Sequence, residues 1–139
     1  MRFWDSSGIL ALLLKEKGSP ETLKLYREDE DQSVWCLTEV EIASALSRCL
    51  REGMDPQDET VARTQFRVLL GRWIEVTSVE SVRARALRLL GTHPLRAADA
   101  LQLAAALVFC DERTESLPFV CLDDRLAEAA RKERFPVLP

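Results

Sequence analysis

The chain has 139 residues, 47% of them hydrophobic and 30% charged, which suits one domain with a packed core. Its formal net charge is −4, so we exclude nucleic-acid binding by positive surface charge alone. The longest apolar run, Leu103–Cys110, is far shorter than the roughly 20 residues of a membrane-spanning helix. Four cysteines without a C-x-x-C pair, and Asp5 ahead of any long apolar stretch, predict reduced thiols in a cytoplasmic protein.

Short apolar segments alternate along the chain with longer segments of helical character. The predicted strands are Met1–Trp4, Ser33–Leu37, Ile74–Val76, Pro118–Leu122 and Phe135–Leu138. The predicted helices are Ser6–Leu14, Ser19–Glu28, Thr38–Arg51, Asp55–Trp73, Ser78–Leu90, Leu95–Cys110 and Asp123–Glu133. Strands that alternate with helices predict an α/β fold whose parallel sheet is covered on both faces.

Two acids directly follow predicted strands. Asp5 comes after the first strand and Asp123 after the fourth. Because ligands bind outside the carboxyl ends of parallel strands, both side chains are expected in one crevice. Asp123 has an alternative role as the N-cap of the next helix. Asp5 is harder to explain in this way, because Ser6-Ser7 offers a cap without it, whereas Asp124 is expected to be an ordinary first-turn acid.

A third acid, Asp99, lies in the predicted helix Leu95–Phe109, where 12 of 15 residues are apolar. The polar residues of this segment are Arg96, Asp99 and Gln102, which form one narrow stripe. A helix that is apolar nearly all round is buried, and an unpaired buried carboxylate is costly. The alternative roles for Asp99 are a salt bridge to Arg96 and a first-turn acid facing the helix dipole.

A fourth acid, Glu41, belongs to a Thr38-x-x-Glu41 pattern at a predicted helix start. This pattern is typical of a capping box, in which the glutamate accepts a hydrogen bond from the N-cap amide. The spacing fits a capping role and a functional role equally well. Glu39, two residues earlier, is expected to be solvated.

The four acids lie on separate elements, and we expect them to converge on the crevice at the carboxyl ends of the strands. At a separation of about 5 Å, each like-charged pair costs on the order of 3 kcal/mol, so the cluster requires a cation or shared protons. Oxygen ligands favour Mg²⁺ or Mn²⁺ over zinc or copper. Such an ion would supply the positive charge that this acidic chain lacks for phosphate, and it would activate water.

Four segments of the chain, in the same order, resemble PIN-domain ribonucleases, specifically the VapC-type toxins of bacterial and archaeal toxin–antitoxin pairs. These segments are Phe3–Ser7, Leu37–Glu41, Leu95–Ala104 and Phe119–Leu126. The resemblance spans essentially the whole chain, and Leu95–Ala104 is its most specific part. It implies a three-layer α/β/α sandwich with a mainly parallel sheet, a single PIN domain over residues 1–139, and metal-dependent endonucleolytic cleavage of RNA.

The acidic cluster of the family falls, by position, on Asp5, Glu41, Asp99 and Asp123. The resemblance implies that Asp5, Asp99 and Asp123 hold Mg²⁺ or Mn²⁺ and that Glu41 orients or deprotonates the attacking water. Ser6 and Asp124 are candidates for polar support of this site. The family's usual partner is a cognate antitoxin that blocks the site, and its toxins commonly form dimers, so we expect a homodimer that does not associate with membranes.

One residue departs from the family pattern and leaves a second function open. Cys121 stands where the family often has Thr or Ser, and a thiol is a weak hydrogen-bonding group. The alternative function is a PIN-like protein-interaction module with weak or no nuclease activity.

For the antitoxin, we expect Ile9–Leu14 and Ile42–Leu50 to form an apolar groove that accepts an amphipathic helix. We also expect a basic side chain of the antitoxin to enter the acidic site.

Overall fold

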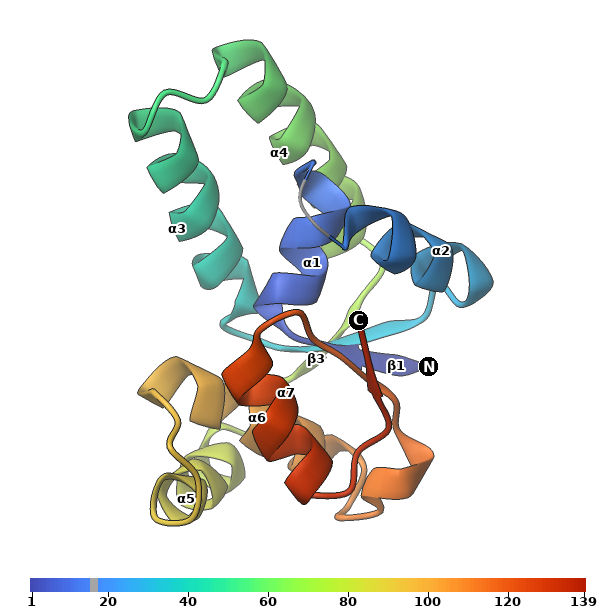
Figure 1. Ribbon diagram of the computed structural model, residues 1–139, viewed down its shortest axis with the longest axis vertical. Coiled ribbons are helices and arrows are strands. Elements are labelled where there is room, and N and C mark those ends of the chain that lie inside the picture. The colour runs from blue at the N-terminus through green and yellow to red at the C-terminus, as the bar shows by residue number, and fades with distance from the viewer. Residues whose placement is uncertain (16–17) are drawn as a thin grey trace.

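The computed structural model describes residues 1–15 and 18–139, and it contains one sheet of five parallel strands (Figure 1). The strands are β1 (Arg2–Trp4), β2 (Gln32–Trp35), β3 (Ile74–Val76), β4 (Phe119–Val120) and β5 (Val137–Leu138). Their order across the sheet is β3-β2-β1-β4-β5. Every neighbouring pair is parallel, as the alternation of strands and helices predicted.

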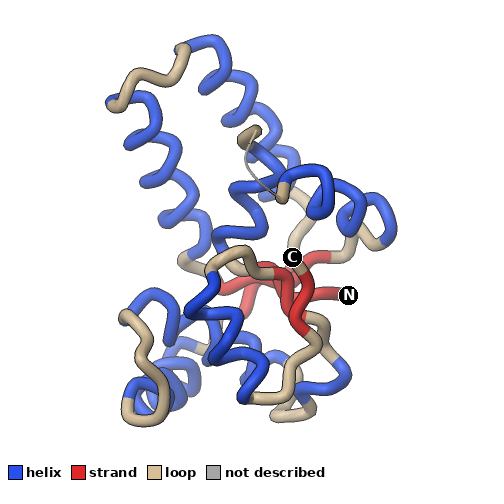
Figure 2. The backbone as a smooth tube through the Cα atoms, in the orientation of Figure 1, coloured by secondary structure: helices blue, strands red, loops and turns tan. Residues whose placement is uncertain are grey.

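Helices cover both faces of this sheet, which lies between them in Figure 2. The helices are α1 (Ser6–Leu13), α2 (Ser19–Glu28), α3 (Thr38–Arg51), α4 (Pro56–Leu70), α5 (Val79–Leu90), α6 (Ala97–Phe109) and α7 (Asp124–Lys132), with a short 3-10 helix η1 (Thr114–Ser116) that the sequence did not predict. Helices α1–α4 pack on one face and α5–α7 on the other. The fold is therefore the three-layer α/β/α sandwich that was expected.

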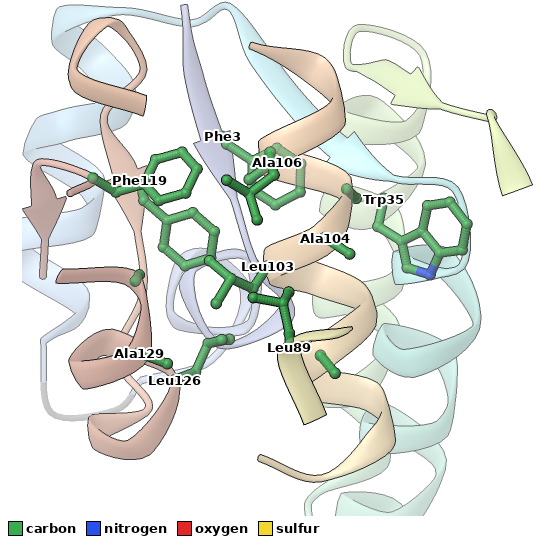
Figure 3. Close-up of a cluster of buried hydrophobic side chains, with 14 of the residues drawn as sticks. Phe3, Trp35, Leu89, Leu103, Ala104, Ala106, Phe119, Leu126 and Ala129 are labelled. Atoms are coloured by element: carbon green, nitrogen blue, oxygen red, sulfur yellow. The ribbon is translucent and has the colours of Figure 1, made fainter. Parts of the chain in front are cut away.

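Alternating side chains of the strands fill two separate cores. On the α5–α7 face, Phe3 stacks on Phe119 with ring centroids 5.4 Å apart, and Trp35 is buried beside α6 (Figure 3). On the opposite face, Trp4 and Val120 pack against α1, α3 and α4. Because these side chains are buried on both faces, Phe3-Trp4 of β1 and Phe119-Val120 of β4 are consecutive apolar residues rather than an alternation of apolar and polar ones.

Two helix boundaries differ from the prediction by more than one residue. Helix α6 begins at Ala97 instead of Leu95, because Arg96 has an extended backbone and serves as the N-cap. Helix α4 ends at Leu70 instead of Trp73, since the chain turns at Gly71. Trp73 is still buried, and it packs edge-on against Phe66 with ring centroids 6.0 Å apart.

No helix within residues 1–15 and 18–139 is long and apolar enough to cross a membrane.

Substitution of Gly8 tests how closely α1 packs on the sheet. A Cβ atom at this position would lie 3.0 Å from the Val120 carbonyl oxygen and 3.2 Å from Trp4 Cε3. We expect Gly8→Ala to lower the free energy of unfolding by about 1–3 kcal/mol, because overpacking a rigid core forces the backbone to shift. Gly71→Ala is the control, since its Cβ would meet its nearest neighbour at an ordinary 3.6 Å. Urea denaturation measures both changes, and equal effects would contradict the packing argument.

Candidate active site

The carboxyl ends of β1 and β4 are adjacent, because these strands pair with Trp4 opposite Val120. Asp5 follows β1, and its backbone N–H donates to the Val120 carbonyl oxygen at 3.2 Å. Asp123 lies just beyond β4 and is the N-cap of α7. The two acids therefore stand at the same edge of the sheet, as the strand pattern predicted.

Asp5 is only 4% exposed and is the N-cap of α1. Its Oδ1 accepts hydrogen bonds from the Gly8 backbone N–H at 3.1 Å and from the Ser7 hydroxyl at 2.7 Å. The expectation that the serines would cap this helix without Asp5 is wrong. Burial raises the pKa of Asp5 to about 6, and the nearby Glu41 carboxyl contributes to the increase, against the effect of these hydrogen bonds.

Ser7 connects the start of α1 to the end of β4, a role that the sequence did not reveal. While its hydroxyl donates to Asp5, it accepts the Leu122 backbone N–H at 2.8 Å. The buried Cys121 thiol lies 3.9 Å from the same hydroxyl and donates to the Asp123 carbonyl oxygen at 3.4 Å. Burial, with Asp5 and Asp123 nearby, raises the pKa of Cys121 well above its usual range. Cys121 is therefore a protonated neighbour of both acids.

Glu41 does not cap α3. The N-cap residue is Leu37 without a capping side chain, so the capping-box interpretation of Glu41 is wrong. Its two carboxylate oxygens instead accept from the Ser6 hydroxyl at 2.7 Å and from Gln102 Nε2 at 3.0 Å. Burial raises the pKa of Glu41, and Asp99 adds to the increase while both hydrogen bonds oppose it.

Asp99 lies in the first turn of α6, where its Oδ2 accepts the Arg96 backbone N–H at 3.3 Å. The expected alternative of a first-turn acid is therefore present, whereas no ion pair joins it to Arg96 in the described part of the chain. Burial raises the pKa of Asp99, and Asp123 adds to the increase, while the positive charges of Arg125 and Arg96 oppose it.

Asp123 is exposed and caps α7, since its Oδ1 accepts the Leu126 backbone N–H at 2.8 Å. The capping alternative is thus confirmed for Asp123. Asp124 is exposed in the first turn of the same helix, as expected. A cavity of about 440 Å³ opens between the two helix starts, and it is lined by Arg96, Asp99, Leu122, Asp123, Asp124 and Arg125.

Each of the four predicted acids lies near the next one in a row, and the four do not form one compact cluster. Repulsion acts between Asp5 and Glu41, between Glu41 and Asp99, and between Asp99 and Asp123. Among residues 1–15 and 18–139, no three His, Cys, Asp or Glu side chains are grouped closely enough to hold a metal ion. Burial and neighbouring carboxylates nonetheless disfavour the ionised forms of Asp5, Glu41 and Asp99, and a hard divalent cation would relieve both effects.

Comparison with known proteins gives the family of this chain. The profile of the PIN domain matches residues 2–132. A crystal structure of PAE2754 from Pyrobaculum aerophilum superposes with a TM-score of 0.63 over 92% of this chain and 78% of that one, at 19% identity, and supports the fold alone. No curated protein matches the chain. The chain belongs to the PIN domain family, a family of nucleases that generally depend on divalent metal ions.

The buried carboxyl of Asp5 predicts a pH-dependent stability in metal-free buffer. Below about pH 4 the folded and unfolded chains both carry a protonated Asp5. Between about pH 4 and the folded-state pKa of about 6, only the unfolded chain loses this proton, so the free energy of unfolding falls as the pH rises. At pH 7.5 we expect Asp5→Asn to be more stable than the wild type by up to about 3 kcal/mol, with little difference at pH 3.5.

Urea denaturation across this pH range measures the effect. Asp31→Asn is the control, because Asp31 is exposed on a loop and its substitution should leave the pH profile unchanged. If Asp5→Asn instead lowers the free energy of unfolding at pH 7.5, the ionised side chain of Asp5 does not destabilise the folded protein.

Proposed function

We propose that this protein is an endoribonuclease dependent on Mg²⁺ or Mn²⁺ and the toxin component of a type II toxin–antitoxin pair, acting in the cytoplasm. The observation that carries the proposal is the row of three carboxyls, Asp5, Glu41 and Asp99, whose pKa values are all raised at one edge of the sheet. Burying such carboxyls near one another destabilises their ionised forms, and a divalent cation bound between them would offset this cost. The PIN domain family supports the nuclease part of the proposal.

In this proposal Asp5, Asp99 and Asp123 would hold a metal ion, which would supply positive charge to the phosphodiester and acidify the attacking water. Glu41 takes the proton of the water that attacks phosphorus, because its carboxylate is anchored at both oxygens and has a raised pKa. Ser6 supports Glu41 through its hydroxyl, and the exposed Asp124 borders the cavity beside Asp123.

A protein-interaction module without nuclease activity is the second candidate function. It is favoured by the lack, within the described ranges, of three acids close enough to bind a metal ion together. Cys121, which stands in place of a hydroxyl residue beside Asp5 and Asp123, favours it as well. Measurement of cleavage separates this candidate from the enzyme.

Cleavage of single-stranded RNA with and without metal tests the proposed reaction. We expect the wild type to cleave with Mg²⁺ or Mn²⁺ and to stop when the ion is chelated. Asp99→Asn and Glu41→Gln should lose on the order of a hundredfold or more in rate, because each removes a charge that acts in the transition state. Glu39→Gln is the matched control, since Glu39 is exposed on the same helix as Glu41 and should retain nearly full activity.

Thermal unfolding gives a second measurement on the same proteins. A metal ion at about 100 times its Kd should raise the Tm of the wild type by roughly 5–10 °C, and Asp99→Asn should lose this increase. A wild type without cleavage or metal-dependent stabilisation would favour the interaction module.

We further propose that a cognate antitoxin binds along the α1–α4 face and that the toxin forms a homodimer. The predicted groove differs in detail, because Ile9, Ile42 and Leu46 are fully buried in the core. The open cavity is instead a hollow of about 690 Å³ between the end of α1, the start of α2, the end of α3 and α4. Leu23 and Val61 border this hollow and are 39% and 53% exposed, which suits the apolar face of a helix.

A second hollow of about 430 Å³ lies between α1 and α3 and includes Glu41 and Arg48. In this proposal the antitoxin helix occupies the larger hollow, which also lies against α1 and α3, and the antitoxin chain continues from there to the acidic site. A basic side chain beyond that helix would replace the charge of the metal ion among the carboxylates, and arginine suits this role because its planar fork serves two carboxylates.

A truncated antitoxin tests this two-part binding. Removal of its basic C-terminal residues should weaken binding only modestly, because the apolar helix still occupies the hollow. The truncated form should nevertheless leave metal-dependent RNA cleavage largely unblocked. Equal inhibition by the truncated and intact antitoxins would show that occlusion by the helix alone is sufficient.

A further inference from the structure

Gln102 lies at the meeting point of three helices that carry the proposed site. It is on α6, one turn after Asp99, and its side chain is 2% exposed. Its Nε2 lies 2.9 Å from Ser6 Oγ on α1, and 2.9 Å and 3.0 Å from Thr38 Oγ1 and Glu41 Oε1 on α3. One amide group therefore connects α1, α3 and α6 directly beneath Glu41.

The orientation of this amide follows from its partners. Ser6 has one hydroxyl proton and donates it to Glu41 Oε2 at 2.7 Å, so Ser6 can only accept from Gln102. Glu41 in its ionised form also accepts only. Reversing the amide would place its oxygen against the carboxylate. Gln102 and Ser6 therefore hold one oxygen of Glu41 each, and together they fix the plane of the carboxylate.

Packing of α6 alone does not require a polar side chain at position 102. The two N–H bonds of Gln102 serve three acceptors, and its buried Oε1 has no hydrogen-bond partner among the described residues. An unsatisfied buried carbonyl destabilises the folded state. The other buried residues of α6 are apolar and pack without such a cost. The polar side chain therefore points to a requirement of the site rather than of the core.

We infer that Gln102 is a positioning residue for Glu41, an inference that rests on the proposed nuclease function. Its N–H holds the Glu41 carboxylate in one orientation and favours its ionised form. Because Gln102 and Asp99 stand on the same face of α6, the hydrogen bond also sets the position of Glu41 relative to Asp99. Gln102 does not touch the reacting atoms in this role and acts only through Glu41.

Two variants separate positioning from simple structural support. Gln102→Met keeps the length of the side chain but removes its donor to Glu41, Ser6 and Thr38. Thr38→Val also removes a buried hydrogen bond of Gln102, but it leaves the contacts with Glu41 and Ser6 in place. Urea denaturation of both variants establishes how far each destabilises the fold.

We expect Gln102→Met to lower kcat for RNA cleavage about tenfold or more with KM changed less than twofold, as for loss of a hydrogen bond to a charged group. Its ascending pH–rate limb should move to higher pH, because loss of the donor raises the pKa of Glu41 further. Thr38→Val should retain the kcat and pH profile of the wild type. Equal losses of kcat in the two variants, or an unmoved pH profile in Gln102→Met, would overturn the inference.

A titration that needs no activity completes the test. In metal-free protein, the carboxyl carbon resonance of Glu41 should titrate at higher pH in Gln102→Met than in the wild type or Thr38→Val. An unchanged titration would also overturn the inference. A wild type that fails to cleave RNA would instead reject the proposed nuclease function, while the NMR comparison would still decide whether Gln102 controls Glu41.

Discussion

The acids of this site repel one another, and the backbone amides of helix starts hold three of them in place. Asp5 and Asp123 each accept a hydrogen bond from a backbone N–H in the first turn of α1 or α7, and Asp99 accepts one from the backbone N–H of Arg96, the N-cap residue of α6. The partial positive charge of a helix N-terminus partly offsets the charge of each carboxylate. Capping and the proposed function are therefore compatible, because the hydrogen bond that caps a helix also fixes the orientation of the carboxylate.

The remaining architecture brings these helix starts to one place. Pairing of β1 with β4 puts the starts of α1 and α7 side by side. Helix α6 is buried along most of its length, so Asp99 is carried on a rigid element. The carboxylate of Glu41 is held instead by side chains from α1 and α6. It is consequently the acid whose position is most sensitive to the packing of its neighbours.

The sequence predicted the sheet and nearly all of the helices because apolar periodicity and capping residues are local signals. It also placed Asp5 and Asp123 at one edge, since this follows from parallel pairing. The role of Glu41 was ambiguous, because its true partners lie 35 and 61 residues away in the chain. Gln102 was visible only as part of a polar stripe, and Ser7 only as a potential cap. Their long-range partners cannot be read from local spacing.

The burial of Cys121 also affects how the site would respond to oxidants. A thiol reacts with peroxides as the thiolate, and here burial together with the Asp5 and Asp123 carboxylates disfavours that form. The cysteine at this position is therefore a disfavoured site for oxidation. Burial and the two nearby carboxylates together keep this sulfur in its less reactive thiol form.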